Sequence, residues 1–244
     1  MQRGLRHLGI QGHRLVSSFL SFIYPSRCPV CRNQSDAHVY APICLCCWST
    51  IERYNGYSCR VCAVPIVSPY AGVCGECLSH PPYFSFVLAY GLYSGILREA
   101  IHLFKFSGIK RLGRPLGRLL SSLPIPEADI IVPVPLSKRG LRQRGFNQTL
   151  ILAKTLSKDL KIPFSMDCLF KRRDTPPQSG IRAVERKRNV KGAFEVREDV
   201  ARKRVILLDD VMTTGATVRE CAKTLAKAGA EEIIVVVLAR SALT

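Results

Sequence analysis

The chain has 244 residues, of which 47% are apolar, so it can bury a hydrophobic core and is not disordered throughout. It contains no run near the roughly 20 apolar residues that a membrane span requires, so we expect a soluble protein without such a span. With 36 basic and 18 acidic residues the formal net charge is +18, which indicates anionic ligands or partners, phosphates first among them.

Residues 1–24 begin with scattered basic residues and end in a short apolar run, Leu15 to Tyr24. This pattern is similar to a signal peptide, but no small-residue cleavage site follows, because Pro25, Ser26 and Arg27 lead directly into a cysteine motif. We therefore expect residues 1–24 to form an amphipathic packing helix, and the protein to be cytoplasmic.

Residues 25–80 are rich in cysteine. Eight of the eleven cysteines form four C-x-x-C pairs, separated by 12, 11 and 11 residues: Cys28 and Cys31, Cys44 and Cys47, Cys59 and Cys62, and Cys74 and Cys77. A C-x-x-C turn presents two thiolates to one tetrahedral ion, so four turns can close two structural zinc sites. Disulfides would need an oxidising compartment, and a thioredoxin-like motif would have a single pair, so zinc is the favoured interpretation.

The spacing leaves open how the four turns pair. Adjacent turns would give one site from residues 28–47 and a second from residues 59–77, whereas a cross-braced arrangement would join the first turn to the third. Cys46 could replace a neighbouring ligand, although a spare thiol is the simpler interpretation. His38 and His80 are near enough to be considered as ligands, but we expect both to be ordinary surface residues.

Two zinc sites would also change where the charge lies. Each site would carry a formal charge of about −2, which brings the +4 of residues 1–80 to about zero. Residues 81–244 hold 29 basic and 15 acidic residues, a net charge of +14. The basic surface is therefore expected on the second domain.

Residues 81–244 alternate apolar runs with amphipathic stretches, which predicts an α/β domain with a parallel sheet flanked by helices. Strands are expected at residues 86–90, 130–134, 205–208 and 233–238. Helices are expected where apolar residues recur every three or four positions, at residues 97–104, 146–160 and 218–225, the last closed by Gly229. A basic loop is expected after Val134.

The segment from Val205 to Thr217 indicates a sugar-phosphate site. A buried aliphatic strand ends in Asp209 and Asp210, and the chain then enters a helix through a short polar loop, Thr213, Thr214, Gly215, Ala216 and Thr217. Hydroxyls, free backbone N–H groups at a helix start and a glycine form a phosphate cradle. The two carboxylates lie at the end of the strand, where open α/β sheets bind ligands, and as acceptors they suit ribose hydroxyls.

This segment resembles the signature of the type I phosphoribosyltransferases. Other segments resemble one branch, the competence protein F and gluconate-utilisation protein X family, whose members also carry a cysteine-rich zinc module in front: Val132–Leu136, Arg142–Gln148, Thr175–Gln178 and Arg186–Phe194. The resemblance spans residues 25–240. It implies a zinc-binding module at residues 25–80 and a type I phosphoribosyltransferase-like domain at residues 81–244.

The resemblance implies that Asp209 and Asp210 contact the ribose of phosphoribosyl pyrophosphate, that residues 213–217 bind its 5′-phosphate, and that Mg²⁺ accompanies it. It also implies that candidate pyrophosphate donors follow Val134: Lys138, Arg139, Arg142 and Arg144. Type I enzymes cover the site with a mobile hood, and the residues implied for it are Thr175, Gln178, Arg186 and Asn189. The implied reaction displaces pyrophosphate from the anomeric carbon with inversion, and the sequence does not identify the acceptor.

Two classes of function remain open. One is a phosphoribosyltransferase that acts in DNA uptake during natural transformation, beside a competence helicase. The other is a non-catalytic accessory protein that keeps the sugar-phosphate site for regulation or binds single-stranded DNA, and the family name also suggests a role in gluconate utilisation. Residues 138–191 hold 15 basic and 4 acidic residues, which suits a nucleic-acid backbone as well as a pyrophosphate. Zinc knuckles that dock a nucleic acid or a protein are a third, less favoured interpretation.

Overall fold

The computed structural model describes residues 27–35, 39–68, 70–173 and 189–242. The chain divides into two compact units, Met1–Ile51 and Glu52–Thr244. The helix expected over residues 1–24 lies outside the described residues. Within the described ranges, no helix is both long enough and apolar enough to cross a membrane.

The first unit is organised around a short helix and a cysteine cluster. Helix α2 (Leu45–Ser49) begins after Cys44, whose sulfur accepts a hydrogen bond from the Cys47 backbone N–H at 3.4 Å. Tyr40 and Trp48 stack with their ring centroids 4.8 Å apart, and Ile43 is fully buried. A unit this small has little apolar core, so we expect metal binding by its cysteines to supply much of its stability.

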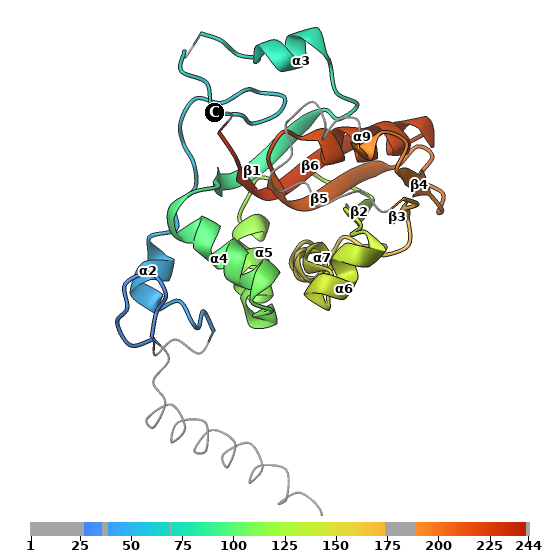
Figure 1. Cartoon of the computed structure of the whole chain (residues 1–244). Helices are drawn as coiled ribbons and strands as arrows, with labels where there is room; N and C mark the ends of the chain where they lie inside the picture. Colours follow the sequence, from blue (N-terminus) through green and yellow to red (C-terminus); the bar gives the residue numbers. More distant parts are fainter. Residues whose placement is uncertain (1–26, 36–38, 69, 174–188, 243–244) are drawn as a thin grey trace, which may run out of the picture. The chain divides into compact units, whose positions relative to one another are not determined.

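The second unit contains a four-stranded parallel sheet in the order β1-β6-β5-β2 (Figure 1). The strands are β1 (Phe86–Leu92), β2 (Ile130–Pro133), β5 (Arg204–Met212) and β6 (Glu232–Arg240). Side chains of β5 and β6 are buried on both faces of the sheet, which explains their continuous aliphatic sequences. The parallel sheet expected from the sequence is confirmed.

Helices cover both faces of this sheet (Figure 1). One face carries α4 (Gly95–Phe106), the 3₁₀ helix η1 (Lys110–Leu112), α5 (Gly113–Ser121) and α7 (Gln148–Leu160), and the other carries α9 (Ala216–Lys227). The predicted apolar stripes are buried as expected, on α4 at Leu97, Ala100, Ile101 and Phe104, and on α9 at Val218, Cys221, Ala222 and Leu225. Helix α9 ends at Ala228 as the C-cap, and Gly229 follows with a left-handed φ of 89°.

Three features differ from the sequence-based expectation. The basic stretch after Val134 is not a loop but a short helix, α6 (Lys138–Arg144). The Ser137 hydroxyl caps it by accepting from the Gly140 N–H at 3.0 Å, and Gly145 ends it with a left-handed φ of 71°. An antiparallel pair, β3 (Leu169–Lys171) and β4 (Phe194–Val196), lies beside α9.

The third difference concerns the cysteines. The last two C-x-x-C turns and helix α3 (Gly75–Ser79) belong to the same compact unit as the sheet. Cys59, Cys62 and Cys77 are buried in one hydrophobic cluster with β1, β5, β6 and α9. The last two turns therefore pack into the core of the second unit, and the expected division of the chain near residue 80 stays a prediction.

Candidate functional site

The loop between β5 and α9 lies at the carboxyl end of the sheet. Strand β2 pairs with β5 only as far as Pro133, opposite Leu208, and β5 then continues through the two aspartates to Met212. Gly215 has a left-handed φ of 77°, and a Cβ there would lie 2.5 Å from the Met212 methyl carbon Cε. The left-handed φ favours glycine at the start of α9, whereas the flexible Met212 side chain could move away from a Cβ. The N-terminus of this helix faces the same edge of the sheet, as a phosphate cradle requires.

The two aspartates lie on opposite faces of the sheet, because successive side chains of a strand alternate. Asp210 is 3% exposed, and its Oδ1 accepts from Lys105 Nζ of α4 at 2.7 Å. Asp209 is partly buried on the face of α9, and its Oδ1 accepts from the Asp210 backbone N–H at 2.8 Å. Asp210 Oδ2 is buried and has no hydrogen-bond partner among the described residues.

Their opposite surroundings move the two pKa values apart. Burial, together with the charge of Asp210, raises the pKa of Asp209 to about 7. Burial also acts to raise the pKa of Asp210, but the Lys105 ammonium outweighs it, helped by hydrogen bonds and by the Arg144 charge, and the pKa of Asp210 lies below its usual value. At neutral pH one carboxylate is therefore ionised and held in place, while the other titrates.

Sequence reasoning did not identify Lys105 as a site residue. The signal was present, because Lys105 continues the buried stripe of Leu97 and Ile101 by one further helical turn. Its side chain is only 14% exposed. Gln148 and Thr149, at the start of α7, are also buried polar residues. The Thr149 hydroxyl donates to the Val134 carbonyl at 2.9 Å and fastens α7 to the end of β2.

Among the predicted pyrophosphate donors whose side chains the structure describes, Arg144 lies close to the aspartates. Arg144 is partly buried, lies over the Phe106 ring at 5.2 Å, and its charge lowers the pKa of both carboxylates. Arg139 and Arg142 are exposed on α6, and Lys138 is the first residue of that helix.

Thr175, Gln178 and Arg186 lie outside the described residues, and Asn189 is partly buried. The two ends of the intervening segment meet, because Arg173 Nη2 donates to the Lys191 carbonyl at 2.6 Å. The Gly192 N–H donates to Glu220 Oε1 of α9 at 2.7 Å. The segment of the expected hood therefore starts and finishes beside the helix that follows the phosphate loop.

The cysteines form two groups of four, and each group uses adjacent turns. The sulfur atoms lie within 4.8 Å of one another in Cys28, Cys31, Cys44 and Cys47, and in Cys59, Cys62, Cys74 and Cys77. Tetrahedral zinc with bonds of about 2.3 Å separates its sulfurs by about 3.8 Å. The sulfur–sulfur distances of 3.6 Å from Cys31 to Cys44 and from Cys62 to Cys74 fit that geometry.

Two of the remaining candidate ligands, Cys46 and His80, are not members of these groups. Cys46 is an exposed thiol on α2. His80 is paired with Glu76 at 3.8 Å, and His38 lies outside the described residues. Burial raises the pKa of Cys28 and Cys59, but backbone N–H donors outweigh it and lower the two values to about 6 and about 7. In the same two groups burial and the neighbouring thiols raise the pKa of Cys47 and Cys77, so a bound metal ion would favour ionisation of all four thiols.

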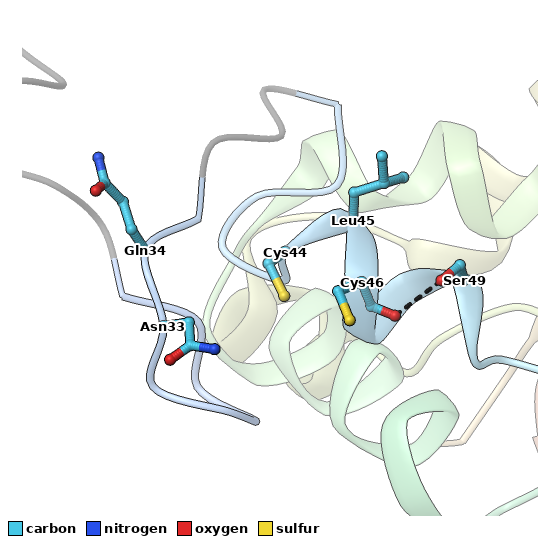
Figure 2. Close-up of a pocket in the computed structure, with 6 residues that line it drawn as sticks. All are labelled: Asn33, Gln34, Cys44, Leu45, Cys46 and Ser49. Carbon is cyan, nitrogen blue, oxygen red and sulfur yellow. Dashed lines mark hydrogen bonds between the residues drawn. The ribbon is translucent and has the colours of Figure 1, made fainter.

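A pocket of about 660 Å³ opens beside the first cysteine group (Figure 2). Its lining includes Cys44, Cys46 and Ser49, and the Ser49 hydroxyl donates to the Cys46 carbonyl at 2.8 Å. None of the residues that line it was predicted to bind the sugar phosphate.

Two family descriptions match parts of the chain. Residues 147–242 match the phosphoribosyl transferase domain, and residues 19–78 match the double zinc ribbon domain. The DNA utilization protein YhgH of Escherichia coli strain K12 is 34% identical over 227 residues, which cover 89% of this chain and 98% of that protein. Competence protein F of Haemophilus influenzae is 37% identical over 185 residues, which cover 70% of this chain and 80% of that protein.

Among solved structures, a glutamine phosphoribosylpyrophosphate amidotransferase from B. subtilis is 25% identical, with a TM-score of 0.37. The match covers 51% of this chain and 25% of that one.

Proposed function

The chain belongs to the competence protein F family, and we propose that its α/β domain binds phosphoribosyl pyrophosphate with Mg²⁺ at the carboxyl end of the sheet. The observation that carries the proposal is the buried, unpartnered oxygen of Asp210, next to a glycine-bearing loop at the start of a helix. A buried acceptor without a donor costs about 1–3 kcal/mol. A ribose hydroxyl supplies the missing donor.

We assign the two aspartates different roles. Asp210 is held by Lys105 and stays ionised, so it presents a fixed acceptor to the ribose. Asp209, with its pKa near 7, becomes a stronger acceptor for a second hydroxyl once it has lost its proton. Substrate binding should therefore be linked to proton release around neutral pH.

The other contacts follow from the loop and from the basic residues. Backbone N–H groups and hydroxyls of residues 213–217 bind the 5′-phosphate at the positive end of the α9 dipole. Arg144 is the first candidate for the pyrophosphate, with Lys138, Arg139 and Arg142 around it. The residues between β3 and β4, Thr175, Gln178, Arg186 and Asn189, complete the predicted site.

The reaction that this arrangement would support is a group transfer at the anomeric carbon. The bond from that carbon to pyrophosphate breaks, the bonding pair leaves with pyrophosphate, and an acceptor nucleophile bonds to the opposite face. Arg144 and its neighbours would stabilise the charge on the departing group, while the aspartates hold the ribose hydroxyls. Mg²⁺ bound with the substrate would neutralise pyrophosphate oxygens, and Asp209 and Asp210 are the carboxylates available to it or to its waters.

We further propose that the protein acts in DNA uptake and contacts single-stranded DNA through its basic surface. The proposal is supported by the names of the relatives, a DNA utilization protein and a competence protein, and by the exposed arginines of α6. A helicase partner remains a proposal that rests on the family resemblance alone. Eight thiols arranged for metal binding favour a reducing compartment, so we propose a cytoplasmic location.

Thermal unfolding of the full chain tests the sugar-phosphate site. Phosphoribosyl pyrophosphate at 100 times its dissociation constant, with Mg²⁺, should stabilise the fold by about 2.7 kcal/mol and raise the melting temperature. Asp210→Asn should abolish the rise, and Asp167→Asn, at an exposed aspartate, should preserve it. An unchanged melting temperature in the wild type would refute the proposal.

A further inference from the structure

A single buried arginine connects the second cysteine group to the start of the phosphate loop. Arg240 is the last residue of β6, lies opposite Met212 of β5 and is 2% exposed. Its Nε donates to the Cys62 carbonyl at 2.9 Å, and its Nη1 donates to the Met212 carbonyl at 2.9 Å. Nη1 also donates to the carbonyls of Thr213 and Ser241. One guanidinium therefore holds both a turn of the cysteine group and the first residue of the loop.

The charge of Arg240 calls for a counter-ion. Within the described part of the chain, no carboxylate lies at ion-pair distance from it, and a buried cation without a partner is costly. Burial lowers the pKa of Arg240, and the sulfurs of Cys62, Cys74 and Cys77, when ionised, oppose this shift. Four thiolates and one Zn²⁺ carry a formal charge of about −2, so the filled metal site would supply the counter-charge.

A second arginine makes a similar connection from the other side of the loop. Arg219 lies in the first turns of α9, where its N–H donates to the Gly215 carbonyl at 2.8 Å. Its Nη2 donates to Cys77 Sγ at 3.2 Å, and its Nη1 donates to the His80 carbonyl at 2.7 Å. The two arginines together balance the charge of about −2 on one zinc site.

We propose that Arg240 and Arg219 are positioning residues through which the second zinc site sets the shape of the phosphate loop, so that phosphate affinity depends on metal in that site. This inference rests on the proposed function, because the loop is taken to bind the 5′-phosphate. Arg240 fixes the loop where it leaves β5, and Arg219 fixes it where α9 begins. The second zinc site then helps to set the conformation of the substrate site, in addition to stabilising the fold around it.

The geometry distinguishes the role of Arg240 from simple charge balance. Its guanidinium reaches carbonyls in different directions at once, which a lysine ammonium on a flexible stem does not reproduce. The Arg240→Lys variant keeps a cation beside the thiolates but loses the planar guanidinium that donates to several carbonyls at once. We therefore expect this variant to retain two zinc ions per chain and still to have a displaced loop.

Calorimetric titration of the full-length Arg240→Lys variant tests the inference. Its affinity for ribose 5-phosphate should fall about tenfold, equivalent to about 1.4 kcal/mol, while its affinity for inorganic pyrophosphate should stay within about twofold. Amide hydrogen exchange of residues 213–217 should be faster than in the wild type. Arg204→Lys, at the opposite end of β5 in an exposed pair with Glu127, is the matched control.

The metal itself is tested with paired cysteine variants. The double variant Cys59→Ser, Cys62→Ser should hold one zinc ion and lose ribose 5-phosphate binding, whereas Cys28→Ser, Cys31→Ser should also hold one zinc ion and keep the affinity. Equal losses in the two double variants would overturn the inference. So would an unchanged ribose 5-phosphate affinity in Arg240→Lys with both zinc ions present.

Failure of the proposed function gives a different result. If the wild type binds neither phosphoribosyl pyrophosphate nor ribose 5-phosphate, the function assigned to the loop is refuted. Hydrogen exchange still tests the coupling in that case. Faster exchange of residues 213–217 in Arg240→Lys, with exchange in β1 unchanged, supports the structural link, and equal exchange in both proteins overturns it.

Discussion

Replacing Lys105 by Met should destabilise the second unit by leaving a buried carboxylate unpaired. Lys105 Nζ lies 2.7 Å from Asp210 Oδ1, and the two side chains are 14% and 4% exposed. Breaking a buried pair from one side costs about 3–5 kcal/mol. Because the Arg144 charge also favours the ionised form of Asp210, we expect a loss near the lower end, about 3 kcal/mol in the free energy of unfolding at neutral pH.

The pH dependence of this loss follows from the pKa of Asp210, which Lys105 holds below the usual 3.8. In the wild type, the pair stabilises the fold above the unfolded-state value, and that contribution disappears as pH falls through the folded-state value. In Lys105→Met, burial dominates and the pKa of Asp210 rises. The variant should therefore lose stability as pH rises above the usual carboxyl value of 3.8.

Urea unfolding followed by circular dichroism is the appropriate assay, because the single tryptophan, Trp48, belongs to the first unit. Lys154→Met removes an exposed lysine of α7 and should change the stability little. Lys105→Met combined with Asp210→Asn should recover at least half of the loss, since the uncompensated charge is gone. If Lys105→Met is no less stable than Lys154→Met, or if the double variant shows no recovery, the buried pair does not have the assigned energetic role.

Three further predictions concern the protonation of Asp209, the loop at Gly215 and the basic surface. In calorimetric titrations, the affinity for phosphoribosyl pyrophosphate should increase as pH rises through about 7, the pKa of Asp209. The Asp209→Asn variant should show a flatter dependence of affinity on pH. A flat profile in the wild type would count against the assigned proton release. Gly215→Ala should cost about 1–3 kcal/mol in urea unfolding, because φ is 77° and the new Cβ meets the Met212 methyl; an unchanged midpoint would contradict this strain. In titrations of single-stranded DNA, Arg139→Gln with Arg142→Gln should lower the logarithmic salt slope by about 1.4, and an unchanged slope would exclude α6 from the DNA surface.

The part of the site that the sequence predicts best is the segment whose functional groups are close together along the chain. An aliphatic run, two acids and a threonine-glycine loop lie within 13 consecutive residues, Val205 to Thr217, and each has its own physical reason. The parallel sheet and the buried stripes of α4 and α9 can likewise be predicted from the spacing and number of apolar residues. For these elements, neighbouring residues carry enough information.

Contacts made over long sequence distances were not predictable. Lys105 meets Asp210 across 105 positions, and Arg240 meets Cys62 across 178. A lysine near the end of an amphipathic helix and an arginine at the end of a strand are ordinary in a single sequence. Only the order of the strands brings them to the aspartates and to the cysteine group.

Two local features were also missed, for different reasons. Helix α6 has no apolar stripe, and its ends are set by the capping residues Ser137 and Gly145. In the sequence, the basic residues between the two caps favoured the interpretation as a solvent-exposed loop. The four C-x-x-C turns are evenly spaced, so the sequence gives no reason to place a boundary between the second and the third. That division depends on the packing of Cys59, Cys62 and Cys77 against the α/β core.

The central claim is that Asp209, Asp210 and residues 213–217 form one site for phosphoribosyl pyrophosphate. Calorimetric titration of the full-length wild type with this compound and Mg²⁺ tests the claim most directly. The account predicts saturable binding of one molecule per chain, lost when Asp209→Asn and Asp210→Asn are combined and kept in Asp167→Asn. Absence of binding to the folded, zinc-loaded wild type, or equal binding by the double variant, would contradict it.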